Sequence, residues 1–385
     1  MKKNTFILAA LALTAASCSE TEIVNSDTQD VKESINFSAY TSRLTKAAQT
    51  DVTTANLSAF NVTAIGNDAI YFNDLTFTKG TAVWESSTEY VWPNYPLDFY
   101  AYNVPVNANE MDKTDFGTYI TLDENRNIKV APAKELANQE DLVVAKALGQ
   151  TSASAGMNEH HAVNLSFKHY LTQIVVKAMN SNTEDYNVDV TDVAIRNIAG
   201  KGVYYFSTDK MTAESGNVAD YVSTFPTKRL TELEHEVMTE DGNGKWYQVP
   251  QTITPWVQST DIKNASKGSY LALKVKITST TNGTPIYPIT SGGGDEYAWM
   301  AVPVPSVVNG DNVYDYVQGK KYTIILNFFS DGTGAGFVDP EYPGDLDGDG
   351  DTEDDKGQPI GVNVIKFNAS VDEWDTENTT ITINL

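Results

Sequence analysis

Cysteine and basic residues are scarce in this sequence, and each shortage excludes a class of protein. The 385 residues include one cysteine, and 27 Lys and Arg stand against 51 Asp and Glu, which gives a formal net charge of −24. A single cysteine excludes a disulfide framework and any zinc or iron–sulfur site built from several cysteines. The acidic excess argues against a nucleic-acid partner, because phosphate-binding surfaces need clustered Lys and Arg. The length allows two or three domains.

An apolar stretch too short to span a membrane opens the chain. Residues Phe6–Leu13 follow two lysines and precede small residues at positions 15–17, a pattern that predicts a signal peptide over residues 1–17. A permanent transmembrane helix would need about 20 apolar residues. The chain is therefore expected to be exported.

The only cysteine, Cys18, comes directly after those small residues. This placement resembles a bacterial lipobox, so we expect Cys18 to be acylated and to become the mature N-terminus; the alternative is an ordinary secretory signal. The acidic residues 19–22 resemble the export tag of lipoproteins on the outer face of the outer membrane. A lipid anchor would hold such a precursor at the membrane without a transmembrane helix.

Beyond this region, alternation of apolar and polar residues predicts short β-strands throughout the chain. Examples are Leu57–Ile65, Leu97–Tyr102, Val163–Phe167 and Tyr322–Phe328, with Gly, Asn, Asp and Pro between such runs. Many short strands at this spacing indicate an all-β chain built of antiparallel β-sandwiches, of which we expect two.

Two segments depart from the strand pattern. A helix is expected only within Ala133–Ala147, and the run Gln150–Gly156 has the composition of a linker. We therefore place the N-terminal sandwich at residues 44–157 and the C-terminal sandwich at residues 158–385.

Catalytic motifs are not found in the sequence. It has no G-x-S-x-G elbow, no Walker A loop and no H-E-x-x-H helix. Acidic residues are abundant, but none stands out as the pair that a glycoside hydrolase would use. We expect no enzymatic activity and no bound organic cofactor.

An acidic loop near the C-terminus is the strongest metal-like feature. Carboxylates at alternate positions followed by Gly350 match the start of a calcium loop, in which they converge on a hard cation. The match ends at the twelfth position, which is Lys356 where Glu is expected. The candidate Ca²⁺ ligands are Asp345, Asp347, Asp349, Asp351 and Asp355, and the alternative is a solvated acidic hairpin loop.

Three parts of the chain carry a family resemblance: residues 34–47, residues 165–176, and residues 320–328 with 365–374. Together they resemble the fimbrillin family, the lipoprotein subunits of type V pili. The resemblance implies two transthyretin-like sandwiches in tandem, a precursor anchored in the outer membrane, and assembly with other fimbrial subunits into a fimbrium by donor-strand exchange, for cell adhesion.

The family resemblance implies that residues 18–43 hold a tether and a removable N-terminal strand. A trypsin-like protease that cuts after Arg43, or alternatively after Lys46, would release this strand and leave an open edge with an apolar groove. The alternative is that Arg43 is a basic loop residue with no processing role. We expect the removable strand to be an edge strand, and the face that fills the groove would be Ile35, Phe37 and Ala39.

The C-terminus supplies the matching donor strand in this interpretation. Because donor and groove are different surfaces, the contact would propagate into a filament. The alternative is an ordinary edge strand of the chain's own sandwich. The candidate donor residues alternate in two runs: Ile365, Phe367, Ala369 and Val371, then Ile381, Ile383 and Leu385.

Two functions are therefore weighed. The first is a structural or tip subunit of a type V fimbria. The second is an outer-membrane surface lipoprotein that binds glycans without polymerising, using a platform of tryptophans drawn from Trp84, Trp92, Trp246, Trp256, Trp299 and Trp374.

Overall fold

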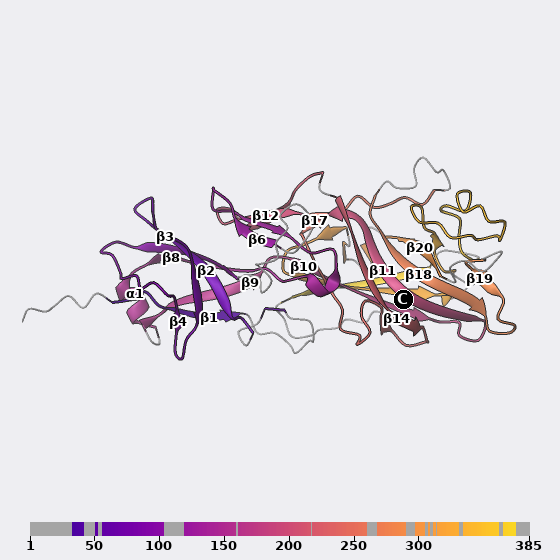
Figure 1. Cartoon of the computed structure of the whole chain (residues 1–385), viewed down its shortest axis with the longest axis horizontal. Helices are drawn as coiled ribbons and strands as arrows, with labels where there is room; N and C mark the ends of the chain where they lie inside the picture. Colours follow the sequence, from indigo (N-terminus) through magenta and orange to yellow (C-terminus); the bar gives the residue numbers. More distant parts are fainter. Residues whose placement is uncertain are drawn as a thin grey trace, which may run out of the picture.

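The protein is an elongated all-β molecule, with two groups of strands at opposite ends (Figure 1). None of its described helices is long and apolar enough to cross a membrane. The computed structural model describes residues 33–41, 51–52, 56–103, 119–158, 161–216, 218–259, 268–289, 297–304, 307–308, 311–312, 314–330, 334–361 and 365–374.

Seven strands at the N-terminal end form a sheet that closes on itself. The inside of this closed sheet is apolar: in β9, Val163, Leu165 and Phe167 are buried, whereas Asn164 and Lys168 face solvent. In order around the sheet, the strands are β1 (Phe37–Thr41), β4 (Trp84–Glu85), β3 (Ala69–Lys79), β2 (Ala59–Gly66), β5 (Leu97–Asn103), β8 (Val143–Gln150) and β9 (Val163–His169).

Two sheets pack face to face at the other end. Both are mainly antiparallel, although β10 and β24 run parallel. The first sheet has the order β15 (His235–Glu236), β10 (Thr172–Asn180), β24 (Lys320–Phe328) and β26 (Lys366–Glu373), with β16 (Trp246–Gln248) also beside β10. The second has the order β14 (Val218–Arg229), β11 (Tyr186–Ala199), β18 (Tyr270–Ser279), β20 (Ala298–Pro303) and β25 (Phe337–Val338), with β19 (Pro285–Tyr287) also beside β18.

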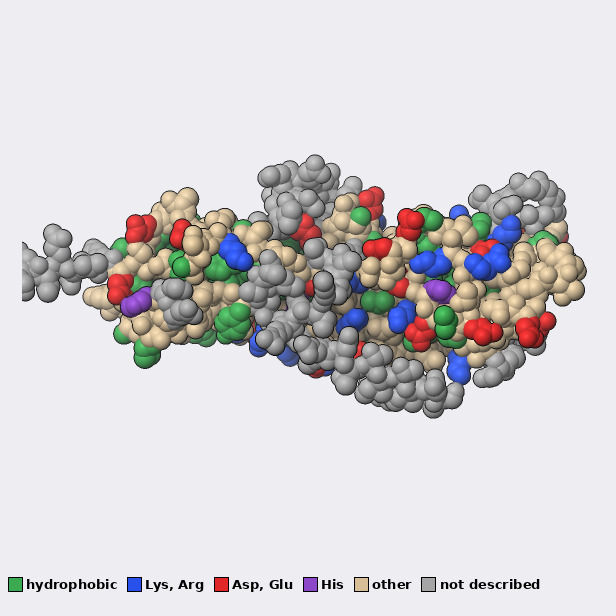
Figure 2. Space-filling model, turned by 90° about the horizontal axis from the view of Figure 1, so that it is seen from below, with side chains coloured by type: hydrophobic (Ala, Val, Ile, Leu, Met, Phe, Trp, Pro, Cys, Tyr) green, Lys and Arg blue, Asp and Glu red, His purple; other side chains and the backbone are tan. Residues whose placement is uncertain are grey.

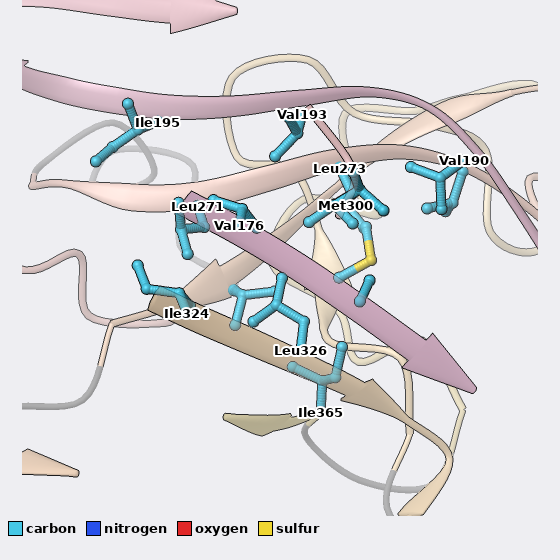
Figure 3. Close-up of a cluster of buried hydrophobic side chains, with 14 of the residues drawn as sticks. Val176, Val190, Val193, Ile195, Leu271, Leu273, Met300, Ile324, Leu326 and Ile365 are labelled. Carbon is cyan, nitrogen blue, oxygen red and sulfur yellow. The ribbon is translucent and has the colours of Figure 1, made fainter. Parts of the chain in front are cut away.

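The core of this sandwich consists of aliphatic side chains from both sheets. Figure 3 shows Val176, Ile324 and Leu326 of the first sheet facing Leu271 and Leu273 of the second. All five side chains are buried, and each contributes about 1.5–3 kcal/mol by leaving water. On the face seen in Figure 2, acidic and basic side chains are interspersed over this half of the molecule.

A small sheet, called the joining sheet below, lies between the closed sheet and the two-sheet sandwich (Figure 1). It combines strands from both halves of the sequence and covers a third apolar cluster that includes Tyr102, Tyr204 and Tyr247. Its order is β13 (Lys210–Ala213), β12 (Gly202–Tyr205), β7 (Ile128–Ala131) and β6 (Tyr119–Leu122). The remaining elements are the strand pairs β17 (Gln251–Thr252) with β23 (Asp315–Tyr316) and β21 (Val307–Val308) with β22 (Asp311–Asn312), and the short helices η2 (Leu136–Asn138) and α1 (Ser152–Gly156).

The expected domain boundary at residue 157 does not separate these sheets. β9 follows that position in sequence but completes the closed sheet, by pairing with β8 and β1. The chain passes to the sandwich only between His169 and Thr172. The expected linker is instead helix α1, whose start is fixed by a capping box between Thr151 and Ser154.

Two further expectations differ from the structure. Val143–Gln150 is strand β8, where the end of a helix was expected, because its apolar residues line the closed sheet. The first unit closes on itself and contains one parallel pair, β1 with β9, where antiparallel pairing alone was expected.

Candidate functional site

Strand β1 is the element on which strand removal would act. It runs parallel to β9 along its whole length and meets β4 at one position, where Phe37 lies opposite Trp84. Just before it, the N–H of Ile35 donates to the carbonyl of Tyr90 at 2.8 Å. β1 therefore lies between two strands and closes the sheet, and the expectation of an edge strand is wrong.

Phe37 lies at the centre of an aromatic cluster. Its side chain is fully buried, and its ring meets three others edge to face, an arrangement that adds to the burial energy. The centroid distances are 4.7 Å to Phe77, 5.1 Å to Phe99 and 6.2 Å to Phe60. Ile35 is 5% exposed, and Ala39 is half-buried against the same cluster.

The slot that β1 occupies has two kinds of wall. One is the backbone of β9, whose N–H and C=O groups pair with β1. The other is the aromatic cluster, which would be open to water without Phe37. An apolar slot beside an unpaired strand can bind another strand with alternating apolar residues.

Asp51 and Val52, the next described residues after β1, are anchored to the body of the protein. The carboxylate of Asp51 accepts a hydrogen bond from the Tyr247 hydroxyl at 2.6 Å and one from Gln173 Nε2 at 2.9 Å, and it lies 3.0 Å from Lys245 Nζ. The next N–H, of Val52, donates to Asp141 Oδ2 at 3.1 Å. The predicted cleavage residues, Arg43 and Lys46, lie outside the described residues, between β1 and this anchor.

β26 carries the first run of predicted donor residues. It pairs antiparallel with β24 from Lys320–Glu373 to Asn327–Lys366 and forms the edge of that sheet. Its apolar face packs on the chain's own core: Ile365 and Ala369 are buried, and Phe367 and Val371 pack against them. These four residues therefore belong to an ordinary edge strand of the chain's own sandwich, which was the alternative interpretation. Ile381, Ile383 and Leu385 lie outside the described residues.

Trp374 connects the end of β26 to the closed sheet. Its ring lies between His169, the last residue of β9, at 4.3 Å and Tyr247 at 5.4 Å, and both contacts are nearly parallel stacks. Nδ1 of His169 lies 2.7 Å from Asp141 Oδ2, and both side chains are fully buried. The region beyond Trp374 thus starts next to β9, the strand that pairs with β1. Nothing in the sequence pattern pointed to this junction.

The acidic loop brings three of its predicted ligands together. The carboxylates of Asp345, Asp347 and Asp349 have oxygens within 4.8 Å of one another. Asp345 also accepts hydrogen bonds from the N–H groups of Gly348 and Gly350, at 2.6 and 3.0 Å. These contacts hold the turn by themselves, so the loop has the chemistry of a calcium site but is also stable as a hydrogen-bonded turn.

The other two predicted ligands, Asp355 and Asp351, make separate contacts in the loop. Oδ2 of the buried Asp355 accepts from the N–H of Leu346 at 2.6 Å. Burial raises the pKa of the Asp355 carboxyl, and the neighbouring aspartates add to that rise. Oδ1 of Asp351 accepts from the N–H of Glu353 at 3.0 Å on the exposed side of the loop. Neither belongs to the group of converging carboxylates.

Comparison with known proteins identifies the family. A model of the fimbrillin-like family matches residues 39–332, more than half of the chain. The chain belongs to the fimbrillin-like family. Membership indicates a subunit of a cell-surface fimbria that assembles with other subunits. A search of curated proteins finds no match.

Solved structures that match this chain include fimbrial proteins. A fimbrial protein of Bacteroides vulgatus is 16% identical with a TM-score of 0.49, and the alignment covers 88% of this chain and 99% of that one. The tip fimbrial protein Mfa3 of Porphyromonas gingivalis, with a C-terminal truncation, is 10% identical with a TM-score of 0.35, over 83% of this chain and 94% of that one.

The tryptophans of this fimbrillin-like chain do not form a platform for sugars. Trp92 and Trp299 are half-buried, and the indole of Trp299 stacks on the guanidinium of Arg196 at 4.7 Å. The other four, Trp84, Trp246, Trp256 and Trp374, are buried. The glycan-binding alternative therefore loses the feature that suggested it.

Proposed function

We propose that this chain is an adhesive fimbrial subunit that polymerises after β1 is cut away and replaced by a strand of a neighbouring subunit. The observation that carries the proposal is the position of Phe37. It fills the centre of the closed sheet, yet the strand that holds it ends two residues before Arg43. A single cut between Thr41 and Asp51 would separate that strand from the anchored body of the protein.

The remaining steps of the proposal follow the sequence. Cys18 carries a lipid that holds the precursor at the outer membrane, and a trypsin-like protease cuts after Arg43 or Lys46. The cut subunit then joins the fimbrium at the cell surface. Replacing Cys18 with alanine should move the uncut precursor out of the membrane fraction, which separates the lipid step from the assembly step.

The donor strand in this proposal is the segment at residues 380–385. Its sequence alternates, with apolar residues at 381, 383 and 385 that match the period of the slot. Residues 366–373 are left out of the donor because they pair with β24 and cover the chain's own core. Several apolar side chains at about 1.5–3 kcal/mol each, with a ladder of backbone hydrogen bonds, would make each junction stable.

Mild trypsin treatment followed by electron microscopy tests the assembly. We expect filaments from the parent chain and N-terminal sequences that start at Leu44 or Ala47. The variant Ile381→Asp/Ile383→Asp should remain monomeric, because it places charges in an apolar slot. The matched control Thr380→Asp/Thr382→Asp carries the same charges on the opposite face and should still polymerise.

Three outcomes would contradict the proposal. Filaments whose subunits still start at Cys18 would refute cleavage, and equal polymerisation of the two double variants would refute the donor role of residues 380–385. Cut protein that stays monomeric under all conditions would favour a surface lipoprotein that does not polymerise.

A further inference from the structure

A small recess lies on the side of the closed sheet, away from the slot of β1. Its volume is about 230 Å³, and four segments far apart in sequence form it. The closed sheet provides Thr63, Ile65 and Tyr100, and two turns of the joining sheet provide the rest. From the turn between β6 and β7 come Leu122, Asn125, Arg126 and Asn127, and after β12 come Phe206 and Ser207.

The first of these turns is held in a defined shape. Oδ1 of Asp123 accepts from the N–H groups of Asn125 and Asn127, both at 2.8 Å, and the Asp123 carbonyl accepts from the N–H of Arg126 at 2.9 Å. These bonds hold Arg126 in the left-handed region, at φ 64°. Strained backbone of this kind persists where neighbouring contacts impose it, and it is enriched at functional sites.

The second turn is fixed in the same way. Oδ1 of Asp209 accepts hydrogen bonds from the hydroxyls of Tyr170 and Tyr204, at 2.6 and 2.7 Å. Asp209 also has a positive φ, of 58°. The turn places Phe206 edge to face with Tyr204, with the ring centroids 5.0 Å apart. Both turns that line the recess are therefore rigid before any ligand arrives, which lowers the entropic cost of binding.

Polar groups at the surface of this recess are free to bind a ligand: Asn125, Arg126 and Ser207 are exposed, and Tyr100 is half-buried. Within the described residues, the guanidinium of Arg126 forms no ion pair, and the Asn125 amide and the Tyr100 and Ser207 hydroxyls make no hydrogen bond. Burial and the Asp98 carboxylate raise the pKa of the Tyr100 hydroxyl, while Arg126 opposes that rise, so the guanidinium lies within electrostatic reach of the hydroxyl. An aromatic pair lies beside these groups, because the rings of Tyr100 and Phe206 meet edge to face with their centroids 5.0 Å apart.

We propose that this recess binds a single sugar ring that carries a carboxylate, such as a uronic or sialic acid at the end of a glycan. The planar guanidinium of Arg126 pairs with a carboxylate through two parallel hydrogen bonds. The Tyr100 and Phe206 rings cover the apolar face of the sugar, and Asn125 and Ser207 bind its hydroxyls. Pockets for drug-sized ligands measure about 300–1,000 Å³, so this smaller volume suits one ring.

This inference does not depend on polymerisation. The recess is complete in the monomer, so binding by the uncut chain can succeed or fail independently of strand exchange. In a fimbrium the same recess would be repeated on every copy, and multivalent binding would raise a weak monovalent affinity.

Calorimetry on the uncut chain tests the proposal with three probes. These are methyl β-glucuronide, N-acetylneuraminic acid and, as the neutral match of the first, methyl β-glucoside. We expect saturable binding of at least one acidic sugar, with the neutral sugar at least about tenfold weaker. The preferred acidic sugar distinguishes a uronic from a sialic acid as the ligand. Binding should weaken at higher ionic strength, since the pair is near the surface.

Variants locate the binding in the recess. Arg126→Gln should weaken binding about tenfold or more, because it removes a charge-assisted pair. Lys79→Gln, which removes the same charge from an exposed position on β3 of the closed sheet, should leave affinity within about twofold. Ser207→Trp should block the recess from its rim while keeping Arg126. An unchanged melting temperature shows that each variant is folded.

Several results would overturn this assignment. They are no saturable binding of any probe, equal affinity for the neutral and acidic sugars, or binding that survives both Arg126→Gln and Ser207→Trp. Equal weakening by Lys79→Gln would show general electrostatic attraction and not a site.

Discussion

Replacing Phe37 with alanine should destabilise the closed sheet far more than any other single change in β1. The side chain is fully buried and meets three aromatic rings. Buried Phe→Ala changes cost about 3–5 kcal/mol, since the lost transfer energy is joined by a cavity. The three edge-to-face contacts place Phe37 at the upper end of that range, because each is worth about 0.5–1.5 kcal/mol beyond area burial.

The matched control lies on the same strand. Tyr40 is 49% exposed, so Tyr40→Ala removes an aromatic ring from β1 without opening the core. Its expected cost is below about 1 kcal/mol. At about 2–4 °C per kcal/mol, Phe37→Ala should lower the melting temperature of the uncut chain by about 6–20 °C, and Tyr40→Ala by less than about 4 °C.

Strand release provides the second assay. After trypsin cleavage, the rate at which the N-terminal peptide leaves can be followed with a fluorophore on that peptide. If the lost contacts appear in the dissociation rate, Phe37→Ala should speed release by about 10²- to 4 × 10³-fold, at about 1.4 kcal/mol per factor of ten. Equal release rates for the two variants would refute the conclusion that Phe37 holds β1 in place.

Three further predictions concern other parts of the chain. Trp374→Ala removes a ring stacked between His169 and Tyr247 and should cost about 3–5 kcal/mol in thermal unfolding; a loss below about 1 kcal/mol would contradict a structural junction. Burial raises the pKa of the Asp339 carboxyl, so its stabilising contribution is present at low pH and is lost as pH rises through the folded-state pKa. Asp339→Asn should therefore gain melting temperature relative to the parent as pH rises above the ordinary carboxyl pKa of about 4, and a difference that does not change with pH would contradict this. Ca²⁺ added to chelator-treated protein should release or absorb heat in calorimetry and raise the melting temperature if the Asp345 loop binds it, whereas Asp345→Asn should reduce both effects; no heat and no shift in the parent would show a hydrogen-bonded acidic turn.

Alternation in the sequence predicted most strands and the buried face of β1. Ile35 and Phe37 lie two residues apart with polar neighbours, and both are buried. The pairing partner could not be predicted. β1 pairs with β9, more than 120 residues away, and local patterning contains no information about which strand closes a sheet. For the same reason β1 was expected at an edge, although it lies between two strands.

The predicted domain boundary at residue 157 differs from the structure for a related physical reason. Residues 150–156 are small and polar, which indicates a linker, but a capping box turns them into helix α1. The strand after this helix, β9, has the alternating pattern of any half-buried strand, so its sequence fits either unit equally well. The recess beside Arg126 was missed because its residues come from four separate segments and only the fold brings them together.

The proposed exchange also explains why a protease would control assembly. While β1 remains covalently attached, its effective concentration at the slot is on the order of millimolar, and a neighbour's strand at micromolar concentration cannot compete on equal contacts. Cleavage between Thr41 and Asp51 changes that balance, because the released strand dilutes away while Asp51 keeps the rest of the chain bound to Tyr247 and Lys245. An intact anchor is thus as necessary as a removable strand. Asp51→Ala should leave uncut protein folded but allow the new N-terminus to detach after cleavage, which hydrogen exchange at Val52 would detect.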